Sequence, residues 1–175
     1  MIALKVIIAS DIHGNLDYTK RLYELCEREE PNKIILLGDL LNNYYYDDYF
    51  TVEEIINLMN RWSALTLAVK GNTDRFDDIE KLNFPFANTY DEIELDDIKF
   101  YYTHGHLIDR LEKTFKDDYV LVGHSHRYNL EGQFINPGSV GLPRYNKEHT
   151  CLIYDNKEFK LINLDDFTII ATKSI

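Results

Sequence analysis

Five short polar segments each follow a hydrophobic run and carry histidine, aspartate or asparagine. They are Ser10-Asp11-Ile12-His13-Gly14-Asn15, Gly38-Asp39-Leu40-Leu41-Asn42, Gly71-Asn72-Thr73-Asp74, Thr103-His104-Gly105-His106 and Gly123-His124-Ser125-His126. In open α/β sheets, ligands bind beyond the carboxyl ends of the strands, so these side chains are expected to meet in one site. Capping and turn formation explain single polar residues at strand ends but not five converging ends.

Pairs of these residues are spaced two apart, at Asp11 and His13, His104 and His106, and His124 and His126. Residues two apart in an extended chain point to the same side, so each pair is predicted to converge. Imidazole nitrogen mixed with carboxylate and amide oxygen, without thiolate, suits divalent ions such as Mn²⁺, Fe²⁺ or Zn²⁺. The residues therefore predict a divalent metal site.

The charge of the chain restricts its partners. The formal net charge is −11, from 30 acidic and 19 basic residues, which argues against non-specific binding to nucleic acid or to an anionic membrane. A small phosphorylated substrate remains compatible, because a bound cation can reverse the local sign. No signal peptide is recognised, and Cys26 and Cys151 are distant single cysteines, so we expect a cytoplasmic protein.

The first 70 residues alternate between predicted strands and helices. Apolar runs at residues 4–9, 33–37 and 65–69 predict buried strands. A first helix, with Leu22 and Cys26 on its apolar face, is expected to stop before Pro31. A second helix is expected to start at Thr51, which opens a capping-box sequence. This alternation favours parallel strands with right-handed crossovers.

The second half of the chain predicts shorter strands. Residues 92–95 and 98–102 form a plausible hairpin, and further strands are expected at 119–122, 134–135, 151–154 and 159–164. Parallel units followed by antiparallel ones predict mixed sheets that pack face to face with helices outside. No linker or repeat divides the chain, so one domain is expected over residues 1–175.

The ordered motifs Asp-x-His-Gly-Asn, Gly-Asp-Leu-Leu, Gly-Asn-Thr-Asp, Thr-His-Gly-His and Gly-His-Ser-His resemble those of the calcineurin-like metallophosphoesterases. The closing Asn136-Pro137-Gly138-Ser139-Val140 is similar to the small bacterial and archaeal YfcE-type phosphodiesterases. This resemblance spans about residues 4–145. It implies an α/β fold, a four-layer α-β-β-α sandwich of two mixed sheets flanked by helices.

The resemblance also implies a dinuclear site. Asp11, His13 and His126 would hold the first metal, Asn72, His104 and His124 the second, and Asp39 would bridge them. The ions are expected to be Mn²⁺, with Fe²⁺, Zn²⁺ or Ni²⁺ as alternatives. The activity implied is the hydrolysis of phosphodiester bonds by a hydroxide that the two metals activate and that attacks phosphorus.

One position departs from the wider superfamily. Many of its members carry a histidine where this chain has Thr73, and that histidine is thought to protonate the leaving group. His106 is the spare histidine near the site, either as a catalytic or substrate-contacting residue or as a hydrogen-bond partner of a ligand. Asp39, Asn72 and His106 are the residues expected to act in catalysis.

Other functions stay open. In the retromer subunit, which resembles these enzymes, the ligand positions are eroded and the protein is a non-catalytic scaffold, whereas none is eroded here. Hydrolysis of phosphomonoesters or nucleotides is a further alternative. The tyrosine-rich residues 42–50 could line a substrate pocket or contact another subunit, and a homodimer or homotetramer is the expected assembly.

Overall fold

A computed structural model describes residues 4–42 and 49–175. Most of the tyrosine-rich segment, for which we predicted a pocket lip or a subunit contact, lies outside these residues.

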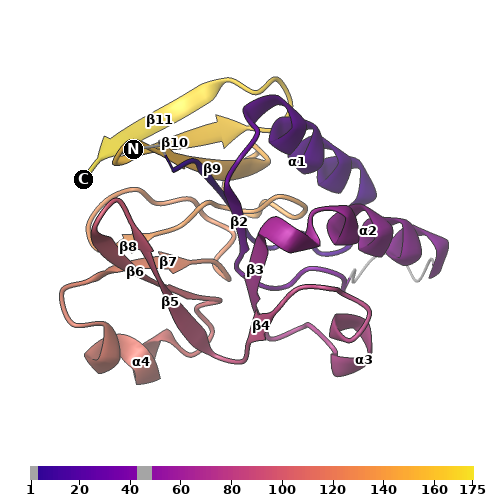
Figure 1. The fold of residues 1–175 in the computed structure, drawn as a ribbon, viewed down its shortest axis with the longest axis horizontal. Coiled ribbons are helices and arrows are strands. Elements are labelled where there is room, and N and C mark those ends of the chain that lie inside the picture. Colours follow the sequence, from indigo (N-terminus) through magenta and orange to yellow (C-terminus); the bar gives the residue numbers. More distant parts are fainter. Residues whose placement is uncertain (1–3, 43–48) are drawn as a thin grey trace.

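Two mixed sheets form the centre of the fold (Figure 1). The larger sheet has seven strands in the order β11-β10-β9-β1-β2-β3-β4. These strands are β1 (Val6–Ala9), β2 (Lys33–Leu36), β3 (Thr66–Val69), β4 (Phe86–Ala87), β9 (Thr150–Asp155), β10 (Glu158–Asn163) and β11 (Ile169–Ser174). The smaller sheet, in the order β5-β6-β7-β8, consists of β5 (Tyr90–Leu95), β6 (Ile98–Thr103), β7 (Tyr119–Val122) and β8 (Phe134–Ile135).

The strands that precede the polar segments run parallel to their neighbours. In the larger sheet β1 pairs in parallel with β2, and β2 with β3. In the smaller sheet β6 pairs in parallel with β7. Parallel pairing places the carboxyl ends of neighbouring strands at the same edge of a sheet, which is what brings the polar segments together.

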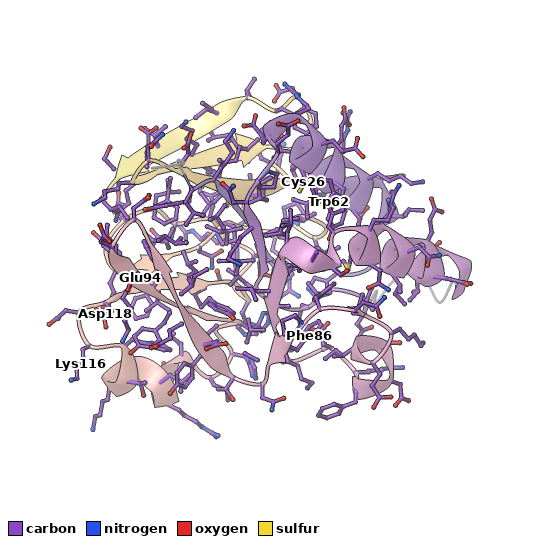
Figure 2. All side chains as sticks on the ribbon, viewed as in Figure 1. Cys26, Trp62, Phe86, Glu94, Lys116 and Asp118 are labelled. Atoms are coloured by element: carbon purple, nitrogen blue, oxygen red, sulfur yellow. The ribbon has the colours of Figure 1, made fainter. Side chains whose placement is uncertain are left out.

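The helices cover the outer faces of the sheets. They are α1 (Leu16–Glu29), α2 (Tyr49–Arg61), the 3₁₀-helix η1 (Ser63–Leu65), α3 (Phe76–Ile79) and α4 (Ile108–Phe115). Figure 1 shows α1 and α2 on the side of the larger sheet that faces away from the smaller one, and α4 beside the smaller sheet. In Figure 2, Cys26 and Trp62 lie on the side of α1 and α2, and Asp118 and Lys116 lie beside the smaller sheet.

The side chains of β1 explain this layering. Ile7 and Ala9 belong to the core under α1 and α2, whereas Val6 and Ile8 belong to the core between the sheets. Because successive strand residues point to opposite faces, a continuous apolar run satisfies both layers at once. The predicted α/β architecture of two mixed sheets flanked by helices is confirmed.

Some predicted details were wrong or incomplete. Helix α2 begins at Tyr49, so Thr51 lies inside the helix and is not its N-cap. We did not predict α3, α4, β4 or β11. Strand β11 lacks the alternation of apolar and polar residues that marks a half-buried strand, because most of its residues are exposed. Among the described residues, no helix is long and apolar enough to cross a membrane.

Candidate metal centre

Two groups of potential metal ligands lie at the carboxyl ends of the strands. The first cluster consists of Asp11, His13 and His126, and the second cluster of Asp39, His104 and His124. Within each cluster, one possible ligand atom of each residue lies within 4.8 Å of the others. Asn72 joins the second cluster, since its Oδ1 lies 3.0 Å from Nε2 of His104. The structure thus brings together all seven residues for which we predicted a metal-binding role.

Asp39 stands between the clusters. Its Oδ2 lies 3.7 Å from Nε2 of His13 in the first cluster and 3.4 Å from Nε2 of His104 in the second. One carboxylate oxygen therefore faces both clusters, as a bridging ligand must.

Backbone carbonyls orient three of the histidines. Nδ1 of His13 is bonded to the carbonyl of Asn42, and Nδ1 of His104 to that of Leu37. Nδ1 of His126 is bonded to the carbonyl of Leu142. A carbonyl oxygen only accepts, so each Nδ1 carries the proton, and in the neutral ring the Nε2 lone pair points into the cluster. These acceptors have no signature in the sequence, because any residue supplies a carbonyl.

The first cluster has the features of a cation site. Nε2 of His13 and Nε2 of His126 lie 3.3 Å apart. Asp11 directs Oδ1 toward the same point, 3.3 Å from Nε2 of His126, and this buried oxygen has no hydrogen-bond partner. Its Oδ2 accepts bonds from the hydroxyl of Ser10 and the backbone N–H of His124. A buried, unsatisfied carboxylate oxygen facing two imidazole nitrogens fits a divalent cation.

The electrostatics of the second cluster also fit a cation site. Burial raises the pKa of Asp39, but hydrogen bonds from His104 and Thr73 outweigh it and hold this pKa below its usual range. Burial lowers the pKa of His104, yet the bond to Asp39 and the charges of Asp11 and Asp39 raise it overall. Burial lowers the pKa of His124 and of His126, which favours the neutral ring that a metal ion binds.

The backbone at the site differs from our expectation. Asp11, His13, Asp39, His124 and His126 have φ values of 54°, 48°, 54°, 65° and 56°. These residues adopt left-handed conformations beyond the strand ends, so the argument from extended-chain alternation was wrong for Asp11 with His13 and for His124 with His126. Asp11 and His13 converge through the turn, whereas His124 and His126 point to different clusters.

Two glycines are required by close packing around the carboxylates. A Cβ on Gly71 would lie 2.1 Å from Oδ1 of Asp39, and a Cβ on Gly123 would lie 1.9 Å from Oγ of Ser10. Both distances are shorter than any real contact, so the loops approach this closely only because these side chains are absent.

His106 lies beside the second cluster without belonging to it. Its ring centroid is 5.4 Å from that of His104 and 6.2 Å from that of His124, and the residue is exposed. Burial, together with the neighbouring His104 and His124, lowers the pKa of His106. The ring of His106 is therefore accessible from solvent.

Comparison with known proteins identifies the family. The family model of the calcineurin-like phosphoesterase superfamily domain matches residues 4–158. The chain belongs to this superfamily. Phosphodiesterase YfcE of Escherichia coli (strain K12) is 30% identical over 181 residues, which cover 98% of each protein. Phosphodiesterase MJ0936 of Methanocaldococcus jannaschii is 29% identical over 182 residues, which cover 93% of this chain and all of that protein.

A solved structure supports the same assignment. The structure of YfcE, a phosphoesterase from E. coli, matches with a TM-score of 0.86 at 30% identity, over 98% of this chain and 100% of the other. The predicted resemblance to YfcE-type metallophosphoesterases is therefore confirmed.

Asp74 holds the loops of this metallophosphoesterase together. Its carboxylate accepts hydrogen bonds from the backbone N–H groups of Asp39, Leu40 and Gly71, each at 2.8 Å. The side chain is 6% exposed, and burial raises its pKa, while the three donors favour the charged form. Asp74 therefore positions Asp39 through hydrogen bonds to backbone N–H groups.

The Asp74→Asn variant should lose about 1–3 kcal/mol of unfolding free energy, because either orientation of the amide turns its NH₂ toward a backbone N–H. Chemical denaturation followed by circular dichroism measures this loss. Asp77→Asn, an exposed site in α3, is the matched control and should change stability by less than about 0.5 kcal/mol. Equal stability of the two variants would contradict the role of Asp74.

Divalent metal should stabilise the folded protein. At about 100 times its dissociation constant, Mn²⁺ should add about 2.7 kcal/mol to the unfolding free energy if it binds only the folded state. Asp11→Asn should lose most of this gain, and Asp17→Asn, exposed on the first turn of α1, should keep it. Thermal unfolding of the chelator-treated protein with and without Mn²⁺ tests this, and an unchanged melting temperature would exclude tight binding.

Proposed function

We propose that the protein is a phosphodiesterase that binds two divalent ions, Mn²⁺ first among the candidates. The position of Oδ2 of Asp39 carries this proposal, because this one oxygen faces His13 of the first cluster and His104 of the second cluster. The names of the relatives YfcE and MJ0936, both phosphodiesterases, support a diester as the substrate. When bound, two such ions hold phosphoryl oxygens and lower the pKa of a water molecule that can attack phosphorus.

The clusters differ in exposure, which suggests the direction from which substrate arrives. Asp11, His13 and His126 are at most 4% exposed. In the second cluster, His124 and Asn72 are exposed, and His106 beside them is exposed as well. We therefore place the phosphoryl group against the second cluster, with the first cluster beneath it.

The acidic chain needs the metals to attract a phosphate. Asp11 and Asp39 offset two of the four positive charges of two divalent ions, so the centre stays positive in a protein of net charge −11. This local reversal suits a small phosphorylated substrate better than a large nucleic acid, which needs an extended basic surface.

Substitution of the ligands should abolish turnover. His126→Ala and Asp39→Asn should each lower kcat/KM for bis(4-nitrophenyl) phosphate with Mn²⁺ by at least about 100-fold, because each removes a metal ligand. Asp77→Asn should keep the full rate. Absence of hydrolysis with Mn²⁺, Ni²⁺, Co²⁺, Fe²⁺ and Zn²⁺ would overturn the proposal in favour of a scaffold, and faster turnover of phosphomonoesters would reassign the substrate.

His106 is proposed to protonate the leaving oxygen. With diphenyl phosphate, whose leaving group is poor, His106→Gln should lower kcat about 100-fold, whereas the effect on 4-nitrophenyl esters should be a few-fold. Only protonated His106 donates, and its pKa is lowered from 6.5, so the difference between wild type and variant should grow as the pH falls below 6.5. Equal losses for both substrates at every pH would instead indicate a positioning role.

A further inference from the structure

A cavity of about 380 Å³ opens next to the second cluster, on the outer face of the smaller sheet. Its apolar wall is formed by Ile108 of α4, Val122 of β7 and Phe134 of β8. Gly105 and His124 line the end that adjoins the metal centre. We call this cavity the Val122 pocket.

The short helix α4 explains why the pocket exists. Phe115 of α4 packs on Tyr101 and Val120 and closes that part of the outer face. The helix begins only at Ile108, so Val122, at the carboxyl end of β7, remains half-buried. Phe134 of β8, which pairs with Val120, is also half-buried. The carboxyl end of β7 is followed by Gly123 and His124, so this half-buried part of the face lies next to the second cluster.

His124 joins the pocket to the metal centre, because it belongs both to the second cluster and to the pocket lining. Gly105, also in the lining, lies between His104 and His106 in the chain. A group attached to a phosphorus atom at the second cluster can therefore reach the pocket by passing the ring of His124.

The polar groups of the pocket do not require a polar ligand. Nδ2 of Asn136 donates to the carbonyl of Gly123 and to the hydroxyl of Ser125, and Oδ1 accepts from the N–H of Gly138. The carboxylate of Asp109 in the lining disfavours a second anionic group. The satisfied amide of Asn136 and the negative charge of Asp109 therefore favour an uncharged, apolar ligand group in this pocket.

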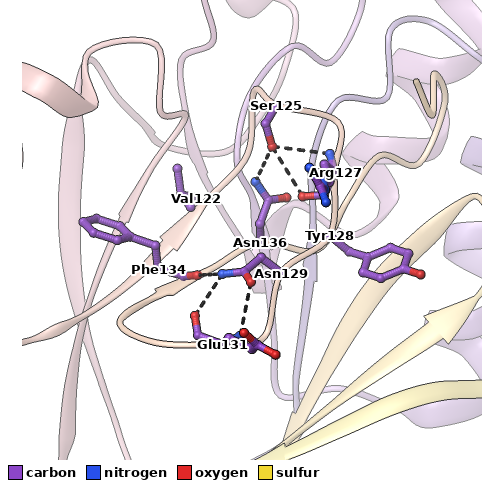
Figure 3. Close-up of a pocket in the computed structure, with 8 residues that line it drawn as sticks. All are labelled: Val122, Ser125, Arg127, Tyr128, Asn129, Glu131, Phe134 and Asn136. Atoms are coloured by element: carbon purple, nitrogen blue, oxygen red, sulfur yellow. Dashed lines mark hydrogen bonds between the residues drawn. The ribbon is translucent and has the colours of Figure 1, made fainter. Parts of the chain in front are cut away.

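A second cavity, of about 500 Å³, continues from the Val122 pocket and shares Val122, Ser125, Phe134 and Asn136 with it. Figure 3 shows Val122 between Phe134 and Asn136, with Arg127 near Ser125 and Glu131 near Asn129. Val122 and Phe134 thus form an apolar wall common to both cavities, and only the Val122 pocket also includes His124.

We propose that the Val122 pocket binds an apolar or aromatic ester substituent of the substrate, so that the protein prefers aryl esters to small alkyl esters. The proposal rests on the proposed phosphodiesterase function in that the phosphoryl group must be held at the neighbouring metal centre. It is tested by binding, independently of turnover.

The test uses methylphosphonate and phenylphosphonate, whose P–C bonds an esterase does not break. Calorimetric titration of the full-length, Mn²⁺-loaded protein should give a dissociation constant about tenfold lower for phenylphosphonate, since partial burial of a phenyl ring favours binding on this scale. Val122→Phe fills the pocket and should reduce the ratio of the two constants to about one. Leu111→Phe introduces the same aromatic side chain on α4 outside the pocket lining and should leave the ratio near ten.

Ile108→Ala provides a second variant that removes apolar wall instead of adding bulk, and it should also reduce the ratio. Equal affinity of the wild-type protein for both phosphonates would overturn the proposal. So would an unchanged ratio in both pocket variants, and a change of oligomeric state in Val122→Phe would then assign the pocket to a contact between copies. A tenfold preference without hydrolysis of any diester would overturn the proposed function and leave the pocket assignment standing.

Discussion

Repulsion among closely spaced electron-pair donors is the constraint on which the rest of the structure depends. In the first cluster, Nε2 of His13 and Nε2 of His126 lie 3.3 Å apart, next to an unsatisfied oxygen of Asp11. Without a cation this arrangement is unfavourable, so the surrounding chain has to hold it. The N–H of Asp11 bonds to the carbonyl of Gly38 and that of His13 to the carbonyl of Asp39, which ties the loops after β1 and β2 together. Each residue in a left-handed backbone conformation costs about 1–3 kcal/mol of folding free energy, and these hydrogen bonds between the loops hold the residues in that conformation.

The same architecture makes the centre asymmetric. The first cluster lies deep and is surrounded by backbone, whereas the second opens toward His106, Asn72 and the Val122 pocket. A buried cluster suits tight retention of an ion, and an open one suits exchange of substrate and product. Asp39 faces both clusters and so links them. The carboxylate of Asp74 holds Asp39 in place by accepting a hydrogen bond from the backbone N–H of Asp39. A substitution of Asp74 would therefore affect the metal centre indirectly, by changing the position of Asp39.

Much of the fold could be predicted where local pattern and burial agree. The β-branched runs of β1, β2 and β3 and the hairpin of β5 and β6 lie where the pattern placed them, because both faces of the first three strands are buried. Prediction failed where the local signal is weak or misleading. Strand β11 pairs with β10 through its backbone while its side chains stay exposed, and α2 starts before the capping-box sequence at Thr51.

By itself, the sequence determined the residue types of the candidate site and their places after hydrophobic runs, and these are sufficient for divalent metal chemistry and for the family. The resemblance to metallophosphoesterases implied which cluster each ligand joins, whereas only the tertiary structure decided how the chain places the ligands there. Spacing alone predicted that His124 and His126 would converge, yet a left-handed turn sends them to different clusters. The carbonyls of Leu37, Asn42 and Leu142 set the ring orientations, and a short helix leaves a pocket open beside His124. The reason is physical: spacing along the chain restricts only neighbours, whereas these contacts join segments that the pairing of strands and the packing of two sheets bring together.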